Sequence, residues 1–451
     1  MLVHGYHPAV EDGELYLPGV KKALNPALYP FNAQFFMSHA RMTLFDELVA
    51  ASVRLSHLPF DYVVFLWHFA CIFVFLLGCW RVSRACFAHP LAPWGSVTLV
   101  ASLLTIPVAG TALYIMDQYL TPRDFSTAGI MLVLADALER RYWRAGLLIL
   151  LIAAVHPLMA VFGAGLLLLL YLEQRRLAPP VAAMLFLPSL APVSSVYRNI
   201  LDTSHAYFLV TRWQWYEWLG IFAPLAILGA IAHYYPRLTA LCRALIAFGL
   251  LSFAAALVLS IPRLAGLAEL QPLRSLHLIF ILLFVLLGGI LAQSVLKTHA
   301  WRWLALLLPI CLGMFYAQRQ LFPASDHLEM PWMSPRNPWA QAFGWIRAHT
   351  PNDAVFALDP DYMNLPGEDE QGFRELAERS SLADIHDKGA VSMFPALAQD
   401  WSAQYQAQQD WPAHLHRLRQ SYNVTWVVLQ NPAPALDCPY RNSTVAVCRV
   451  D

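Results

Sequence analysis

The chain has 451 residues, of which 58% are apolar and 13% are charged, and its formal net charge is zero. A soluble globular protein carries about a quarter charged residues, so this composition excludes a water-soluble protein and indicates a polytopic membrane protein. The neutral balance gives no electrostatic reason to expect nucleic acid as a partner.

Residues 1–59 form a polar, proline-containing opening with the acids Glu11, Asp12 and Glu14. They contain no apolar run that could serve as a signal sequence or span a bilayer. The aromatic residues that follow, such as Tyr16 and Phe35, suit a segment lying on the outer membrane surface. Acids held there can act as a general base or bind a divalent cation such as Mg²⁺ or Mn²⁺. The alternative is that they only solvate a loop and cap a helix.

About ten apolar runs follow, and they predict a transmembrane helical domain over residues 60–317. The runs cover residues 60–80, 94–115, 125–138, 143–155, 158–172, 181–196, 215–234, 244–261, 276–296 and 303–316. The two runs that flank His156 are short, and they predict a tight hairpin that does not cross the membrane fully.

The placement of arginines predicts the orientation, because basic residues collect in cytoplasmic loops. One alternating set of loops is rich in them: Arg81, Arg84, Arg140, Arg141, Arg144, Arg175, Arg176, Arg237, Arg243, Lys297 and Arg302. We expect this set in the cytoplasm, and residues 1–59 and the C-terminal tail outside it. An outside N-terminus without a preceding span is unusual, so we expect a further spanning helix before Met1 in the full protein. The alternative is that the first helix translocates a short N-terminus.

Residues 318–451 are more polar and long enough for a small domain. The stretch "NPWAQAFGWIRAHT" predicts a helix with Trp339, Phe343 and Ile346 on one face, and "AVFAL", "YNVTWVVLQ" and "STVAVCRV" predict strands. Helices are expected near "EQGFRELAERSS" and "WPAHLHRLRQSY". The pattern favours a small extracytoplasmic α/β domain.

Two of the seven cysteines, Cys438 and Cys448, lie in this tail. An oxidising compartment would let them form a disulfide, and the alternative is two unpaired thiols. The other cysteines lie in or beside apolar runs, where a thiol behaves as a small hydrophobe.

Further candidate site residues lie in the loops expected outside. Asp117 and Arg123 share one loop, where an arginine beside acids could bind a lipid phosphate. His156 lies at the outer end of the short hairpin, and Arg274 and His277 lie one helical turn apart, so they face one side. The alternatives are an ordinary charged loop, a packed histidine and an arginine that only snorkels. The sequence has no phosphate-binding glycine loop and no metal-type Cys/His cluster.

The acid pair Glu11-Asp12 in the first outer loop, the arginine-bearing cytoplasmic turns, the short hairpin and the soluble C-terminal domain resemble the GT-C superfamily of membrane glycosyltransferases. Stretches such as "EDGELYLPGVKKALNPALYP" and "HPLMAVFG" are also similar to uncharacterised bacterial membrane proteins of this build. The resemblance implies a multi-pass protein of a bacterial inner membrane. It would transfer a sugar from a polyprenyl-phosphate carrier to an envelope glycan or protein acceptor at the outer face.

In that interpretation Asp12 or Glu11 is the general base, and Arg123 or Arg274 stabilises the leaving phosphate. Two other classes stay open. A non-catalytic scaffold of envelope assembly would use the C-terminal domain to bind a partner. A transporter or flippase is less favoured, because the sequence shows no clear repeat and its ionisable residues cluster at helix ends.

Overall fold

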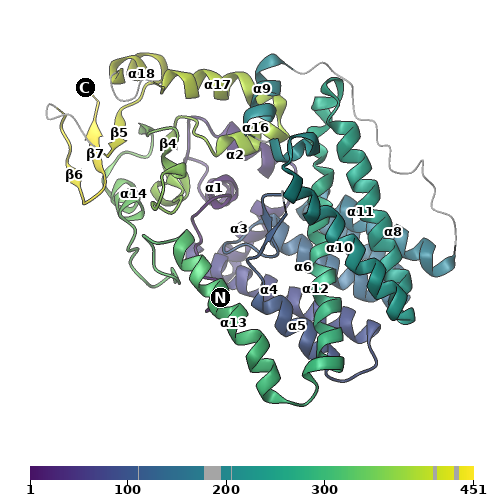
Figure 1. Cartoon of the computed structure of the whole chain (residues 1–451). Coiled ribbons are helices and arrows are strands. Elements are labelled where there is room, and N and C mark those ends of the chain that lie inside the picture. Colours follow the sequence, from purple (N-terminus) through teal and green to yellow (C-terminus); the bar gives the residue numbers. More distant parts are fainter. Residues whose placement is uncertain (110, 177–193, 205, 410–413, 431–435, 451) are drawn as a thin grey trace.

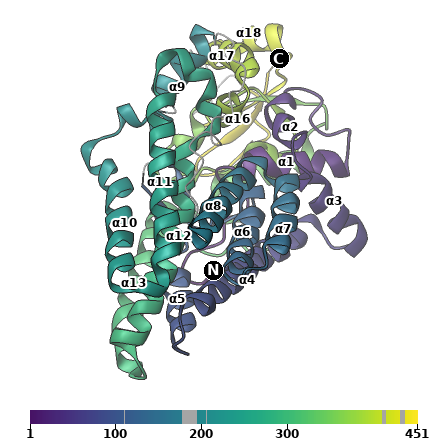
Figure 2. The same ribbon diagram turned by 90° about the vertical axis from the view of Figure 1, so that its right-hand side faces the viewer.

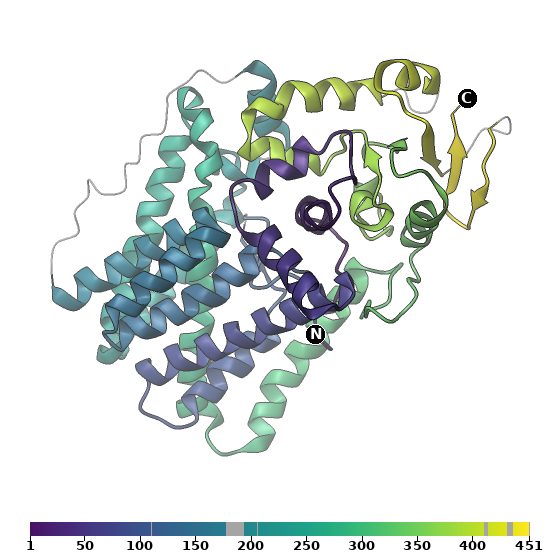
Figure 3. The ribbon, with the colours of Figure 1, turned by 180° about the vertical axis from the view of Figure 1, so that it is seen from behind.

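The computed structural model describes residues 1–109, 111–176, 194–204, 206–409, 414–430 and 436–450. A bundle of apolar helices forms one part of the molecule, and a small mixed α/β domain built from the C-terminal residues lies against one end of the bundle (Figure 1). The N-terminal helix α1 (Gly13–Leu24) lies between these two parts, as the view from behind shows (Figure 3). The acids next to α1 therefore lie near the junction.

Six helical segments within the described residues are long and apolar enough to cross a membrane. They are α4 (Phe60–Cys86), α8 (Pro157–Arg175), α10 (Trp215–Tyr234), Pro236–Leu259, which contains α11 (Thr239–Leu259), Gly266–Leu296, which contains α12 (Leu276–Leu291), and α13 (Ala300–Leu321). α13 is the most exposed of them, since none of its apolar stretch is buried in the protein. These lengths and compositions indicate a multi-pass membrane protein.

The expected ten runs differ from this set in a few places. The run at residues 94–115 is not one span: α5 (Ala92–Ser102) ends early, and the short strands β1 (Pro107–Val108) and β2 (Leu113–Tyr114) form a hairpin after it. Proline has no backbone donor and restricts the residue before it, so Pro107 prevents the helix from continuing. α6 (Pro122–Leu138) and α7 (Tyr142–Val155) are also shorter than a full span. The run at residues 181–196 lies mostly in residues 177–193, outside the described part.

The short hairpin around His156 is present as α7 and α8, but its two arms differ. α7 has 14 residues and would extend about 21 Å at 1.5 Å per residue. α8 has 19 residues and is long enough to cross. The expectation of a hairpin that does not cross fully therefore applies to α7 and not to α8.

The loops that carry most arginines lie at the bundle end away from the C-terminal domain, as Figure 2 shows for the lower helix ends. Arg81 at the end of α4 donates to Asp136 of α6 over 2.6 Å. A cavity of about 700 Å³ at this end is lined by residues 86–90, residues 234–238 and Gln293. The alternation of helices thus separates these basic loops from the C-terminal domain.

Reporter fusions test the orientation. Fusions after Arg84, Arg144 and Lys297 are expected to report the cytoplasm, and a fusion after Asp451 the opposite side, because the arginine bias sets orientation. Paired alkaline phosphatase and fluorescent-protein fusions give the measurement. A cytoplasmic signal after Asp451 would contradict an extracytoplasmic C-terminal domain.

Three helices form the N-terminal segment: α1, α2 (Gln34–Ala40) and α3 (Phe45–Ser56). The aromatic residues expected on the membrane surface are largely buried inside the protein. Phe35 packs with residues of the C-terminal domain, and Tyr29 packs on Phe36 with ring centroids 5.2 Å apart. α3 instead carries exposed apolar side chains, with Leu55 82% exposed, and these suit a membrane interface.

The C-terminal domain is built on a five-stranded mixed sheet of order β4-β3-β5-β7-β6. The strands are β3 (Val355–Ala357), β4 (Ser380–Ser381), β5 (Trp426–Leu429), β6 (Tyr440–Arg441) and β7 (Ala446–Arg449). β3 pairs in parallel with β4 and β5, whereas β7 runs antiparallel to β5 and β6. The expected strands at β3, β5 and β7 are confirmed, and so is the small C-terminal α/β domain.

The domain also contains the helices α14 (Pro338–His349), α15 (Phe373–Ala377), α16 (Asp387–Met393), α17 (Ala398–Ala407) and α18 (Leu415–Tyr422). Of these, α14, α15 and α18 pack against the sheet. The expected face of α14 is confirmed, because Trp339, Phe343 and Ile346 are all buried. Asn337 caps this helix by accepting from the backbone N–H of Trp339. α16 and α17 were not expected from the sequence. They connect the domain to other parts of the chain, because α16 contacts α2 and both helices contact α9 (Ser195–Ser204).

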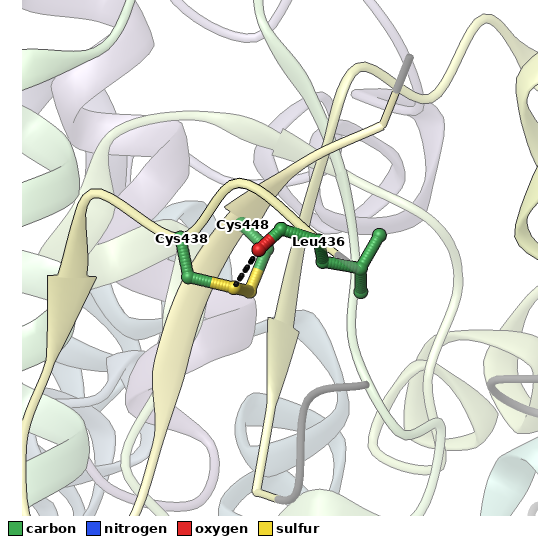
Figure 4. Close-up of a disulfide and its surroundings, with 3 residues drawn as sticks. All are labelled: Leu436, Cys438 and Cys448. Atoms are coloured by element: carbon green, nitrogen blue, oxygen red, sulfur yellow. Dashed lines mark hydrogen bonds between the residues drawn. A yellow bond between two sulfur atoms is a disulfide. The ribbon is translucent and has the colours of Figure 1, made fainter. Parts of the chain in front are cut away.

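The predicted disulfide between Cys438 and Cys448 is present and joins the segment before β6 to β7 (Figure 4). The other five cysteines are free, four of them buried. A disulfide in the C-terminal domain is consistent with an extracytoplasmic location, since cytoplasmic thiols are kept reduced.

Candidate functional site

The acid pair of the first loop meets α6 at the end of the bundle that faces the C-terminal domain. Asp12 immediately precedes α1, its side chain is 35% exposed, and its Oδ2 lies 3.6 Å from Nη2 of Arg123. Arg123 is buried in the first turn of α6 and donates to Oδ2 of Asp117 from Nε at 3.2 Å and Nη2 at 2.5 Å. Three residues expected at the site are thus brought together, and Asp12 is the most exposed of them.

The start of α6 is fixed by a capping box, in which Asp124 accepts from the backbone N–H of Thr121 over 2.9 Å. Pro122 occupies the first helical turn, where its missing N–H costs nothing. This local sequence therefore holds Arg123 in one place.

Glu11 differs from Asp12 in its surroundings. It accepts a hydrogen bond from the Tyr119 hydroxyl at 2.8 Å. Burial and the charge of Glu370 together raise the pKa of Glu11 to about 7, although the Tyr119 hydrogen bond opposes the shift. Glu11 is therefore protonated in a large share of molecules at neutral pH and already has a partner. Of the two expected bases, Asp12 is the better placed to meet a substrate.

Arg274 lies in the 3₁₀ turn η6 (Pro272–Ser275) that leads into α12. Its guanidinium lies 5.8 Å from the ring centroid of Phe208, and its Nε is buried without a hydrogen-bond partner. Within the part of the chain that the structure describes, Arg274 has no carboxylate in ion-pair distance. It lines a small cavity with Thr111, Tyr207, Gln271 and other residues of these turns. A half-buried cation of this kind is suited to an anionic ligand.

The remaining expected site residues lie in the same region. His277 is buried in the first turn of α12, and its Nε2 is 3.0 Å from the backbone oxygen of Ile115. His156 caps α8, where its Nδ1 accepts from the backbone N–H of Met159 at 3.4 Å. Both histidines lie within the electrostatic influence of Arg123 and Arg274. Their hydrogen bonds to backbone groups indicate that they position the loops around the site.

Several residues near the site were not expected there from the sequence, which predicted a membrane-surface position for Tyr16. They are Tyr16, His39, Tyr207, Glu370 and His386. Tyr16 and His39 lie on α1 and α2 and pack edge to face, with ring centroids 5.6 Å apart. Burial lowers the pKa of His39 to about 4, so its imidazole is neutral at physiological pH. No local sequence pattern marks these residues, because tertiary contacts alone bring them together.

Within the described residues, no three His, Cys, Asp or Glu side chains are grouped closely enough to hold a metal ion. The divalent cation considered from the sequence therefore has no ligand set in this part of the chain. The arrangement of Asp12, Arg123 and Arg274 instead combines a half-exposed carboxylate with two guanidinium groups, which suits proton transfer beside a phosphate.

The fold and the site together define a multi-pass helical membrane protein with charged groups gathered where the bundle meets a disulfide-containing domain. No protein-family model matches this chain, and no curated protein matches it in sequence.

Proposed function

We propose that this protein is a GT-C-like membrane glycosyltransferase that moves a sugar from a polyprenyl-phosphate carrier to an acceptor hydroxyl at the outer face of the membrane. The observation that supports this most is Arg274, a half-buried guanidinium with no ion-pair partner within the described residues, in the same group of charges as Asp12. Arg274 lies at the start of α12, and this end of an apolar helix is where the phosphate of a membrane-embedded lipid would lie.

The reaction follows from these groups. Asp12 accepts the proton of the acceptor hydroxyl, the hydroxyl oxygen bonds to the anomeric carbon, and the bond from that carbon to the carrier phosphate breaks. The departing phosphate gains negative charge, which Arg274 stabilises by charge-assisted hydrogen bonds. Arg123 is held by Asp117 and contacts Asp12, so its role is to orient the base. We therefore assign the phosphate to Arg274 in preference to Arg123.

Carrier binding tests this assignment. The Arg274→Gln variant, purified as the full chain in lipid nanodiscs, is expected to bind decaprenyl phosphate at least about tenfold more weakly, because hydrogen bonds to a charged group contribute about 1.5–3 kcal/mol. Native mass spectrometry measures the bound fraction across a titration.

Arg336→Gln serves as the matched control, since Arg336 is an exposed arginine of the C-terminal domain segment. It is expected to bind the lipid as the wild type does. Equal binding by the wild type, Arg274→Gln and Arg336→Gln would contradict a carrier site at Arg274 and would favour the non-catalytic scaffold.

A further inference from the structure

The C-terminal domain brings two ionisable side chains to the acid pair of the first loop. Nε2 of His386, at the start of α16, lies 3.5 Å from Oε2 of Glu370. His386 is 19% exposed and Glu370 is 40% exposed, so the pair is open to solvent on one side. α16 also packs against α2, where Phe394 lies edge to face with His39. The pair therefore lies between the domain and the N-terminal segment.

Backbone contacts fix Glu370 relative to Glu11. Val10 and Gln371 form an antiparallel bridge, the backbone N–H of Gly372 donates to Ala9 over 2.7 Å, and that of Glu11 donates to Glu370 over 3.3 Å. Glu11 and Glu370 flank this bridge with φ of 48° and 49°, in the left-handed region that non-glycine residues seldom adopt. Such strain persists only where the surroundings impose it, and it concentrates at functional sites.

The charges around His386 connect it to Asp12. Burial acts to lower the pKa of His386, but the hydrogen bond to Glu370 and the carboxylates of Asp384, Glu370 and Asp12 outweigh it and raise the pKa to about 9. His386 is thus an imidazolium at neutral pH, and Asp12 is one of the carboxylates whose charge favours that state. The backbone N–H of His386 donates to Asp384 over 2.9 Å, which fixes the start of α16.

These groups differ in chemistry from those around Arg274. The guanidinium of Arg274 lies beside the aromatic rings of Tyr207 and Phe208, and this cation suits a lipid phosphate. Near Glu370 lie carboxylates that accept hydrogen bonds and an imidazolium that donates them, a combination that matches the hydroxyl groups of a sugar. Asp12 is electrostatically linked to both sides, through His39 and Arg274 on one and His386 on the other.

We propose that Glu370 and His386 form the acceptor side of the site, where the C-terminal domain binds a polyhydroxylated acceptor, a sugar, beside Asp12. This rests on the proposed transferase function. Glu370 accepts a hydrogen bond from one acceptor hydroxyl, and His386 donates to another and holds Glu370 in place. The C-terminal domain is then a substrate-binding part of the enzyme. Transfer requires both the carrier side of the site, at Arg274, and the acceptor side, at Glu370 and His386.

Sugar binding tests this proposal without a turnover assay. Saturation-transfer NMR on the full chain in nanodiscs, with methyl glycosides of glucose, galactose, mannose and arabinose as probes, is expected to show binding of at least one probe by the wild type. His386→Gln and Glu370→Gln are each expected to weaken that binding about tenfold or more, because a site built for hydroxyl groups is left with unpaired polar groups. His416→Gln, at an exposed histidine of α18, is the matched control and is expected to bind normally.

Decaprenyl phosphate provides the second arm of the test. His386→Gln and Glu370→Gln are expected to bind it as the wild type does, which also shows that the variants are folded. Loss of carrier binding in Arg274→Gln with sugar binding retained would confirm two separate sides. Sugar binding that is unchanged in both acceptor-side variants, or no binding of any glycoside by the wild type, would overturn the acceptor assignment while leaving the carrier result to decide the transferase function.

Discussion

Replacing Asp12 by asparagine is expected to lower sugar transfer by about a hundredfold or more, while binding of decaprenyl phosphate is retained. The substitution keeps the size of the side chain but removes the carboxylate that accepts the acceptor proton, and positioned general bases contribute about 10²–10⁴ to rate. Asp12 is the most exposed carboxylate in contact with Arg123, so it is the one that a substrate can reach. The readout is the envelope glycan or glycolipid made when the variant is expressed in a deletion strain.

Two companion variants sharpen this test. Asp353→Asn, at an exposed acid in the turn before β3, is expected to restore the glycan fully. Glu11→Gln is expected to have a smaller effect than Asp12→Asn, because Glu11 already accepts from Tyr119 and is partly protonated at neutral pH. Full complementation by the double variant Glu11→Gln, Asp12→Asn would show that the acids only solvate the loop, and would support the scaffold.

The helical bundle could be predicted from the sequence where one physical signal dominates. The expected span at residues 215–234 coincides with α10, because a long apolar run ends at a capping box on one side and at Pro236 on the other. The prediction of one span at residues 94–115 is wrong, because a helix end and a hairpin lie within a stretch that is apolar throughout. Composition indicates burial in lipid or protein, but it does not set where the backbone turns.

The candidate site was only partly predictable, for a related reason. Asp12, Asp117, Arg123, His156 and Arg274 could be chosen because alternating helices bring every second loop to the same end of a bundle. Glu370 and His386 carry no such signal: their position depends on the bridge between Val10 and Gln371, which joins the N-terminal segment to the C-terminal domain. Sequence spacing does not reveal a contact between residues so far apart in the chain.

The roles of the charged residues in α15 also could not be predicted from the sequence. From the sequence, Arg374 has the ordinary appearance of a charge at a helix end, yet its side chain is 1% exposed. It forms two parallel hydrogen bonds to Asp387, from Nη1 at 2.8 Å and Nη2 at 2.7 Å. Glu14 of α1 lies 3.7 Å from Arg374 and accepts from the backbone N–H groups of Arg374 and Glu375. Glu14 therefore caps a helix of the C-terminal domain, and this buried network fixes α1, and with it Asp12, to the domain.

Replacing Arg374 by methionine is expected to destabilise the junction between α1 and the C-terminal domain by about 3–5 kcal/mol, because removing one partner of a buried ion pair leaves the other charge uncompensated. Asp387 would lose its cation, and Glu14 would lose its nearest positive charge. Thermal unfolding followed by tryptophan fluorescence measures the loss, with Arg417→Met, at an exposed arginine of α18, as the control that is expected to unfold like the wild type.

The pH dependence of this variant separates lost charge compensation from lost packing. Burial raises the pKa of Glu14 to about 8 and, with the charge of Asp387, that of Asp384 to about 6, although Arg374 opposes both shifts. Without Arg374 these folded-state pKa values rise further above their unfolded values near 4. A group whose pKa is raised by folding contributes stability below its unfolded pKa and loses it as pH rises through the folded pKa. The deficit of Arg374→Met should therefore be largest near pH 9 and smallest near pH 5, whereas a deficit independent of pH would mean that Arg374 contributes only by filling space.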